Sequence, residues 1–442
     1  MSKLPPGPRM PRALQAVGWT QRPLPWLERC HRRYGDTFTL RIRHYGDWVI
    51  LSDPDDVKKV FTAGQAVGVA TANPLLGPLL GPRSVMLLEE PVHMTRRKLM
   101  LPSFHGQAVQ ADAEMMAKVA RQNVESWPVG EPFVLWPRMQ DVTLDVVMRA
   151  VFGPDSQSPR LQPLRERLQA LTTWMNEPRN LAMLAAFGPG WVIRSQGYRE
   201  AMGAVEEAVM EEVRRRKSEP EGGTPGVVSM LVRASYEDGT PMSDQDLRDE
   251  LVTLLSDGPT SSTLAWTFER LLRNPDKLEQ LRADILNGDG SYLDAVVKET
   301  LRLRPPVPVV VRTLLEPMRL GGYDLPAGTI VAPCIHLIHR DERWYPEPRR
   351  FLPERFVGKQ PGTYTWIPFG GGVRRCLAAS YAEMEMKRVL RIVLETTELR
   401  AVESSAERAR KSAISFAPDQ KGLVIAEPRE PEGAGSPTLA PV

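Results

Sequence analysis

The sequence predicts a mainly α fold with a minor β-sheet lobe. Apolar residues recur at helical spacing through most of the stretch 89–303, which predicts a succession of helices. Short runs that favour strands occur before residue 52, after residue 312 and near the C-terminus. Hydrophobic residues make up 42% of the chain and charged residues 25%, which is typical of a globular protein.

The N-terminal part is predicted to combine a helix with two strands. The pattern at 26–34 predicts a short helix that ends at Gly35. Strands are predicted at 37–43 and 48–51, with a turn around Gly46-Asp47 between them.

Helices follow from residue 53 onward, apart from one long loop. Asp53-Pro54 is typical of a helix start, and that helix is predicted to reach Phe61. The stretch 64–81 is rich in Gly, Pro and Leu without a clear period, so we predict a loop, and long loops in compact domains are often functional. Strands are expected within 312–331. The remaining predicted helices are 89–104, 108–127, 141–152, 163–175, 198–217, 227–236, 243–272, 276–286, 292–303 and 377–394.

The chain is predicted to form one domain, 1–427, followed by a disordered tail, 428–442. A length of 442 residues would allow about three domains, yet no Ser/Gly tract, charge block or internal repeat marks a linker. The tail is rich in Pro, Gly and small residues, which cannot bury a core.

Charge and hydropathy exclude several classes of protein. A net charge of +3 is too small to argue for nucleic-acid binding. No apolar run is long enough to cross a bilayer, and the N-terminus lacks the apolar core of a signal peptide. Three cysteines do not make a disulfide framework, and they fit a reducing compartment. A cytoplasmic protein without a transmembrane anchor is therefore expected, and we expect a monomer.

The most informative segment is 369–376, which reads FGGGVRRC. Its glycines, Gly370 among them, allow positive φ and a close approach of the backbone to a flat partner. Cys376 precedes a predicted helix, so backbone N–H groups and the positive helix end can point at its sulfur and favour the thiolate. A thiolate held in this way is suited to binding iron. The alternative is a Gly-rich turn with a buried cysteine that has no chemical role.

This segment resembles the haem-binding signature of the cytochrome P450 superfamily, Phe-x-x-Gly-x-Arg-x-Cys-x-Gly. Phe369, Gly372, Arg374 and Cys376 match, and Ala378 replaces the last glycine. The resemblance covers about Leu4 to Val424, and it implies the cytochrome P450 fold of the soluble bacterial type. It also implies haem b held between a long central helix and the cysteine loop. Cys376 would be the axial ligand to the iron, Phe369 would pack beside its sulfur, and Arg374 would contact a haem propionate.

Other motifs extend the resemblance. Glu299 and Arg302 match Glu-x-x-Arg, and their i,i+3 spacing places them on one helix face. The segment 351–356 reads FLPERF, and its Arg355 would join them in a buried structural triad. His93 and Arg97 share a face at i,i+4 spacing; together with Arg312 they would reach the propionates.

The central helix departs from the family pattern. Where relatives carry Ala/Gly-Gly-x-Asp/Glu-Thr-Thr/Ser, segment 257–262 reads DGPTSS. The small first residue has become Asp257, the acid has become Thr260, and the alcohol persists only as Ser261. Pro259 removes one backbone donor and would clash with the carbonyl of Leu255, which favours a helix stop and restart at this place.

Oxygen activation needs protons from positioned donors, so three interpretations stay open. Asp257, Thr260 and Ser261 could form a rearranged proton relay for ordinary monooxygenation. Asp257, which is four residues before Ser261 and on its helical face, could instead bind a polar group of the substrate. The enzyme could also use peroxide, or catalyse coupling, isomerisation or dehydration. Asp257 turned aside as a helix cap is compatible with the first interpretation.

The resemblance implies an apolar substrate pocket and separate electron donors. Val309, Val310 and Phe416 are expected to contact a small lipophilic substrate. Electrons would come from a ferredoxin or flavodoxin with its reductase, docking on a cationic patch of Arg96, Arg97, Lys98 and Arg375. The functional alternative from another class is a non-catalytic haem protein that senses or carries a ligand.

Overall fold

Helices account for most of the chain in the computed structural model, which describes residues 4–69, 76–220, 223–256, 258–403, 405–412 and 415–429. The expectation of a mainly α protein with small sheets is confirmed. The helices are α1 (Arg12–Gln21), α2 (Pro23–Tyr34), α3 (Pro54–Thr62), α4 (Leu76–Leu80), α5 (Val92–Met100), α6 (Gln107–Val124), α7 (Leu135–Phe152), α8 (Gln162–Asn176), α9 (Pro178–Phe187), α10 (Pro189–Arg194), α11 (Gln196–Ser218), α12 (Val227–Arg233), α13 (Asp244–Leu255), α14 (Pro259–Leu272), α15 (Pro275–Asn287), α16 (Ser291–Leu303), α17 (Ile335–Ile338) and α18 (Ala379–Thr396).

The strands form one five-stranded sheet and three smaller ones. The larger sheet has the order β1-β2-β8-β5-β3, in which only the β2–β8 pair is parallel. The strands are β1 (Thr37–Ile42), β2 (Gly46–Leu51), β3 (Val67–Gly68), β4 (Pro132–Val134), β5 (Arg312–Leu314), β6 (Met318–Leu320), β7 (Tyr323–Leu325), β8 (Ile330–Pro333), β9 (Thr397–Ala401), β10 (Ala409–Ser412), β11 (Ser415–Pro418) and β12 (Leu423–Pro428).

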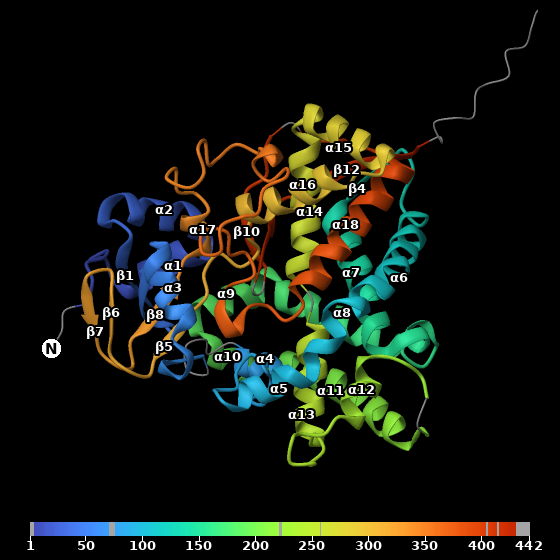
Figure 1. The fold of residues 1–442 in the computed structure, drawn as a ribbon, viewed down its shortest axis with the longest axis horizontal. Helices are drawn as coiled ribbons and strands as arrows, with labels where there is room; N and C mark the ends of the chain where they lie inside the picture. Colours follow the sequence, from blue (N-terminus) through green and yellow to red (C-terminus); the bar gives the residue numbers. More distant parts are fainter. Residues whose placement is uncertain are drawn as a thin grey trace, which may run out of the picture.

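The larger sheet and the main helical body lie at opposite ends of the molecule (Figure 1). In the helical body, α14 packs against α7, α16, α18 and β11. Leu264, Trp266, Phe268 and Leu271 on α14 are at most 1% exposed. α14 is buried on nearly all sides, its serine and threonine residues included, so it lies in the interior of the helical body.

Local capping explains where two of the helices begin. The Asp53 carboxylate accepts hydrogen bonds from the backbone N–H groups of Asp55 and Asp56, and Pro54 occupies the first turn of α3. Ser243 and Asp246 form a capping box at the start of α13. The start of α3 is the one that Asp53-Pro54 predicted.

The predicted continuous helix 243–272 is wrong in one respect, because the helix is interrupted. α13 ends at Leu255 and α14 begins at Pro259, so the proline stands in a first turn, where its missing N–H is not needed. Gly258 has an extended φ of −176°. The stop and restart expected from Gly258-Pro259 is therefore the observed arrangement.

The loop predicted at 64–81 is also partly wrong. Residues 67–68 form β3 beside β5, and residues 76–80 form α4, while 70–75 lie outside the described residues. α1, α9 and α10 had no predicted counterpart. α9 and α10 follow α8 with one residue between successive helices, and Pro178 and the Gly188-Pro189 pair mark these boundaries in the sequence.

No helix among the described residues is long and apolar enough to span a membrane. Most of the predicted tail, 430–442, lies outside the described residues, while Pro428 is the last residue of β12. The single domain 1–427 stays a prediction.

Candidate functional site

The glycine-rich loop that carries Cys376 is held against the end of α3. Gly372 has a φ of +65°, and a Cβ there would lie 1.9 Å from the carbonyl oxygen of Phe61. The Cys376 N–H donates to the carbonyl of Phe369 at 2.9 Å and closes the loop. Gly370 has a φ of +69°, and a Cβ there would meet nothing within 4 Å. The loop is thus packed tightly on one side and faces open space at Gly370.

Cys376 keeps accessible surface although many protein atoms surround it. The residue is exposed, and burial among protein atoms still raises the pKa of its thiol. Weaker effects lower the same pKa, namely a hydrogen bond from the Ala378 N–H and the charges of Arg375 and Arg97. The low thiol pKa expected for Cys376 is therefore wrong for the chain by itself. Burial outweighs the hydrogen bond from Ala378 and the two nearby charges.

Several cationic groups gather beside this thiol. Arg97 on α5 interacts with the Cys376 sulfur, and burial lowers the pKa of its guanidinium. Burial, followed by the charge of Arg374, lowers the pKa of Arg312 to about 10, and the pKa of Arg374 is lowered by burial as well. Burial is the first cause of each shift, and repulsion between Arg312 and Arg374 adds to it for Arg312.

Two acidic residues that the sequence did not single out partly balance this charge. His93 Nδ1 lies 2.7 Å from a Glu90 carboxylate oxygen. Arg374 donates to the carbonyl of Leu88 at 2.8 Å and lies 3.3 Å from the Glu89 carboxylate. Glu90 precedes His93 by three residues, and this i,i+3 spacing was the signal that could have found it.

The residues present fit a haem group. Among the described residues, no carboxylate lies within ion-pair distance of the Arg97 or Arg312 guanidinium; Arg312 donates only to the carbonyl of Val311, at 2.8 Å. Two such guanidinium groups suit two propionate carboxylates. Cys376 offers an accessible sulfur ligand in the same loop, and the open side of Gly370 leaves room for a flat ring.

The restarted helix α14 carries hydroxyl groups in its first turn. Ser261 is 1% exposed, and its hydroxyl donates to the carbonyl of Gly258 at 3.0 Å. The Ser262 hydroxyl lies 3.2 Å from that of Ser415 on β11. Thr260 is half-buried in the first turn. Asp257 lies outside the described residues.

The predicted substrate residues come from neighbouring segments. The Phe416 N–H donates to the carbonyl of Pro306 at 3.0 Å, and the Phe416 carbonyl accepts from the Trp266 indole at 3.0 Å. These contacts join β11 to α14 and to the segment before β5. Val309 and Val310 are half-buried and pack against two different apolar clusters, since successive residues of an extended segment point to opposite sides.

Glu299, Arg302 and Arg355 lie together away from the thiol. Two nitrogens of Arg302 lie 2.7 and 2.8 Å from the Glu299 carboxylate, and both side chains are fully buried. Arg355 Nε lies 3.5 Å from the same carboxylate. Arg302 also donates to the carbonyls of His339 and Pro348, which fixes the segment before the cysteine loop.

The proposed cationic docking patch is wrong at Arg96. This side chain is 2% exposed and is paired with Asp246 at 2.7 Å and Glu250 at 2.9 Å. Its partners are 150 or more residues away in the chain, so the run of basic residues could not reveal them. Lys98 and Arg375 are exposed and Arg97 is half-buried.

Comparisons with known proteins show the family to which the chain belongs. The family described as Cytochrome P450 matches residues 3–423. A Mycobacterium tuberculosis protein named "Putative cytochrome P450 135B1" is 40% identical over 431 residues, which cover 94% of this chain and 89% of that protein. Another from the same organism, "Putative cytochrome P450 137", is 36% identical over 438 residues, with the same two coverages.

Solved structures agree in fold. "Crystal structure of cytochrome P450DA heme domain" matches with a TM-score of 0.82 at 23% identity and covers 97% of this chain and 98% of that one. "Retinoic acid bound cyanobacterial CYP120A1" matches with a TM-score of 0.83 at 22% identity, covering 97% and 100%. The chain belongs to the cytochrome P450 family, and a haem b cofactor and the haem-thiolate monooxygenase class follow from that membership.

Proposed function

We propose that this enzyme oxidises a small lipophilic molecule with dioxygen, using haem b ligated by Cys376. The observation that carries the proposal is that the Cys376 thiol remains accessible in the folded chain and interacts with the Arg97 guanidinium. When bound there, the haem iron would supply the redox chemistry of dioxygen activation. The protein would hold the ring, orient the substrate, exclude water and deliver protons.

The cationic cluster would anchor the cofactor. Arg97, Arg312 and Arg374 would hold the propionates, and His93 would support them through its contact with Glu90. Their unbalanced positive charge supports this assignment, because a buried cation without a counter-ion is costly. Phe369 would pack beside the sulfur. Gly370 would leave the space that the ring requires.

Ser261 and Thr260 would hold the protons for oxygen activation. The Ser261 hydroxyl already donates to the Gly258 carbonyl at the helix interruption, so it is held in one orientation. A positioned hydroxyl can pass a proton onward from water. A contribution of Asp257 to the same relay remains part of the proposal.

The substrate would be lipophilic because its expected contacts are apolar. Phe416 is 4% exposed, and Val309 and Val310 are half-buried. Such a pocket orients an apolar molecule through shape and a small number of polar groups.

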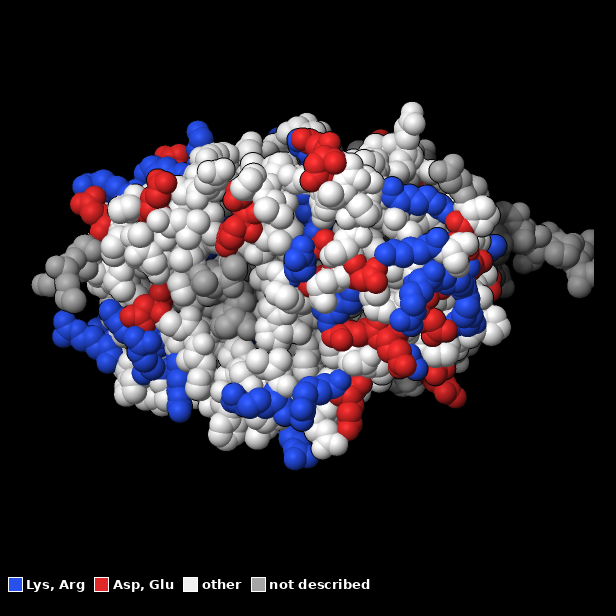
Figure 2. All heavy atoms as spheres, turned by 90° about the horizontal axis from the view of Figure 1, so that it is seen from below, with Lys and Arg blue, Asp and Glu red and all other residues white. Residues whose placement is uncertain are grey.

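Electrons would come from a separate ferredoxin or flavodoxin with its reductase. The exposed Arg375 and Lys98 would form the docking patch together with the half-buried Arg97, whereas Arg96 is excluded by its burial. On the face drawn in Figure 2, acidic and basic side chains are mixed over the right half, while basic side chains gather along the lower edge. We expect a monomer.

The first experiment is a ferric absorption spectrum titrated with lipophilic candidate compounds. A shift of the iron from low spin to high spin would identify a bound substrate class. Cys376→Ser should abolish the thiolate spectrum, whereas Cys30→Ser, a control at another cysteine, should retain it. Retention of the thiolate spectrum in Cys376→Ser would overturn the proposal.

Turnover with each identified ligand then separates the remaining alternatives. Oxidised product that forms with a reductase and NAD(P)H supports monooxygenation. Product that forms with peroxide alone would favour the peroxide-driven alternative, and a rearranged product without oxygen incorporation would favour isomerisation. Tight binding without any product would favour a sensor or carrier.

A further inference from the structure

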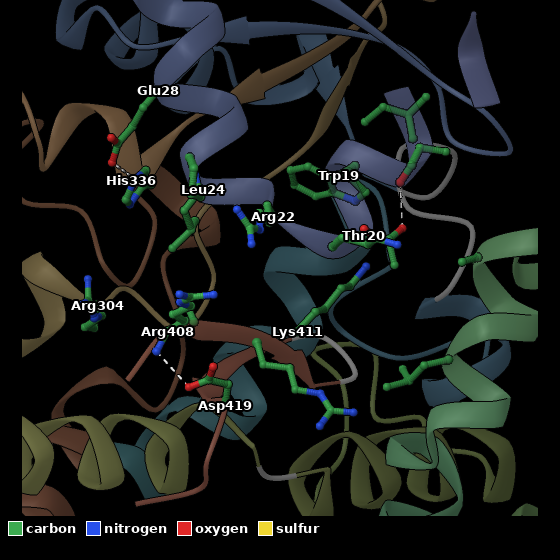
Figure 3. Close-up of a pocket in the computed structure, with 18 of the residues that line it drawn as sticks. Trp19, Thr20, Arg22, Leu24, Glu28, Arg304, His336, Arg408, Lys411 and Asp419 are labelled. Atoms are coloured by element: carbon green, nitrogen blue, oxygen red, sulfur yellow. Dashed lines mark hydrogen bonds and ion pairs between the residues drawn. The ribbon is translucent and has the colours of Figure 1, made fainter. Parts of the chain in front are cut away.

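A second pocket lies between the N-terminal helices, α9 and the β10–β11 hairpin (Figure 3). Its volume is about 820 Å³. None of the five residues assigned to the thiolate and the propionates lines it, so it is separate from the haem site. Lysine and arginine side chains outnumber carboxylates eight to three along its wall.

The three carboxylates of this pocket are already engaged. Glu28 lies 3.0 Å from His336 Nε2 and is also paired with Arg349. Glu407 accepts the backbone N–H groups of Gly422 and Gln420 at 2.7 and 3.0 Å. Asp419 accepts the backbone N–H of Arg408 at 2.8 Å. The positive charge of the wall is therefore not neutralised from within it.

Arg304 is the cation that most clearly lacks an acceptor. Within the described chain, its guanidinium makes no hydrogen bond and has no carboxylate within 4 Å, and its buried Nε is without a partner. The group is held at 4.7 Å from the centroid of the Trp266 ring, which fixes its plane. Burial, followed by repulsion from Arg270, lowers its pKa to about 10. A rigid, charged fork with free donors is suited to two oxygens of one anion.

Neighbouring groups reinforce the positive field around Arg304. Arg340 donates to the carbonyl of Leu303 at 3.1 Å; burial and then the charge of Arg304 lower its pKa to about 9. On the other side of the pocket, Lys411 lies 5.8 Å from the ring centroid of Trp19 and has no ion pair within the described residues. Figure 3 shows Arg304 and Lys411 on opposite sides of the pocket, with Leu24 above them in this view.

Apolar side chains form the rest of the wall. Trp19 and Leu24 are each 7% exposed, and Leu184 on α9 is 6% exposed. An inorganic anion would leave this apolar surface uncovered, whereas an anion with a hydrocarbon chain would bury it. Charge and shape thus point to the same class of ligand.

We propose that this pocket binds a lipophilic carboxylate. The carboxylate pairs with the Arg304 guanidinium, in the field of Arg340. The hydrocarbon body extends over Leu24 toward Trp19.

The test measures octanoate binding to the holoenzyme by calorimetry, with the iron blocked by a phenylimidazole so that the haem site cannot contribute. We expect saturable binding at one site, and clearly weaker binding of octanamide and of sulfate. Equal binding of octanamide would overturn the role of charge, and equal binding of sulfate would overturn the role of the apolar wall.

Variants locate the site. Arg304→Gln should weaken octanoate binding about 10- to 100-fold, because a hydrogen bond to a charged group is lost. The octanoate affinity of Arg304→Lys should lie between those of the parent protein and Arg304→Gln. Arg319→Gln removes an exposed arginine on β6, far from this wall in the fold, and should bind like the parent protein.

A second variant tests the pocket in case Arg304→Gln does not fold. Ala185 is half-buried on α9 and lines the pocket, so Ala185→Glu adds a carboxylate to the wall without deleting a contact of Arg304. This change should also weaken octanoate binding. Unchanged binding in both variants would overturn the proposal, even if the thiolate spectrum and turnover were normal.

Discussion

The Arg96 guanidinium lies 2.9 Å from the Glu250 carboxylate, and this ion pair joins α5 to α13 in the interior of the protein. Asp246 lies 2.7 Å from the same guanidinium. Because α5 carries His93 and Arg97, the pair fixes the helix that presents the cationic cluster to the Cys376 side of the site. Arg96 belongs to a run of basic residues in the sequence, but its buried ion pairs give it a structural role.

Asp246 should make stability depend on pH. Burial alone would raise its pKa, but hydrogen bonds from Arg83 and Arg96 outweigh burial and lower the pKa to about 2. The carboxylate therefore stabilises the fold above its unfolded pKa of about 4, and this contribution is lost as the pH falls from about 4 toward 2. Asp246→Asn should cost about 2 kcal/mol at neutral pH. Urea unfolding should show the difference from the parent protein shrinking below pH ~4.

Glu237→Gln serves as the control for this prediction, since Glu237 is 84% exposed and its ion pair with Lys98 is 3.3 Å long. It should change the unfolding free energy by less than about 0.5 kcal/mol. A difference for Asp246→Asn that grows on acidification would contradict the assigned direction of the pKa shift.

Glu299→Gln should destabilise the protein strongly. It would leave the fully buried Arg302 without its counter-ion, which typically costs about 3–5 kcal/mol. Glu395→Gln, which removes a partly exposed partner of Arg391, should cost no more than about 1 kcal/mol. Thermal unfolding of the two variants should separate these cases, and equal losses would mean that the buried pair contributes no more than a surface pair.

Gly372 and Gly358 provide a matched test of the cysteine loop, because both have a φ of +65°. Gly358→Ala should cost only the backbone strain, about 1–2 kcal/mol, since its Cβ would meet no atom within 4 Å. Gly372→Ala adds a collision with the Phe61 carbonyl and should cost a further ~1–3 kcal/mol together with a loss of bound haem. Similar stability and haem content in the two variants would mean that the loop can move away from α3 at little cost.

Ser261→Ala should slow product formation about 100-fold or more if its hydroxyl relays protons. Ser262→Ala removes the neighbouring hydroxyl, which faces Ser415 instead, and should retain most of the rate. The measurement is product formed per electron consumed, with an identified substrate. An equal effect of both changes would argue against a specific relay at Ser261.

The sequence by itself determined the helical fold class, the position of the cysteine loop and the interruption near Pro259. These features are local, since periodicity, glycine at positive φ and the missing N–H of proline act within a few residues. The Glu299–Arg302 pairing was likewise accessible, because the two side chains are one helical turn apart.

Only the tertiary structure decided which charges are paired. Arg96 finds its carboxylates on α13, more than 140 residues away, whereas Arg304 ends beside Trp266 with no carboxylate of the described residues within ion-pair distance. The thiol pKa of Cys376 likewise depends more on how much protein surrounds it than on the N–H donor of Ala378 before the helix. Burial and long-range pairing are set by packing, so no local pattern in the chain could determine them.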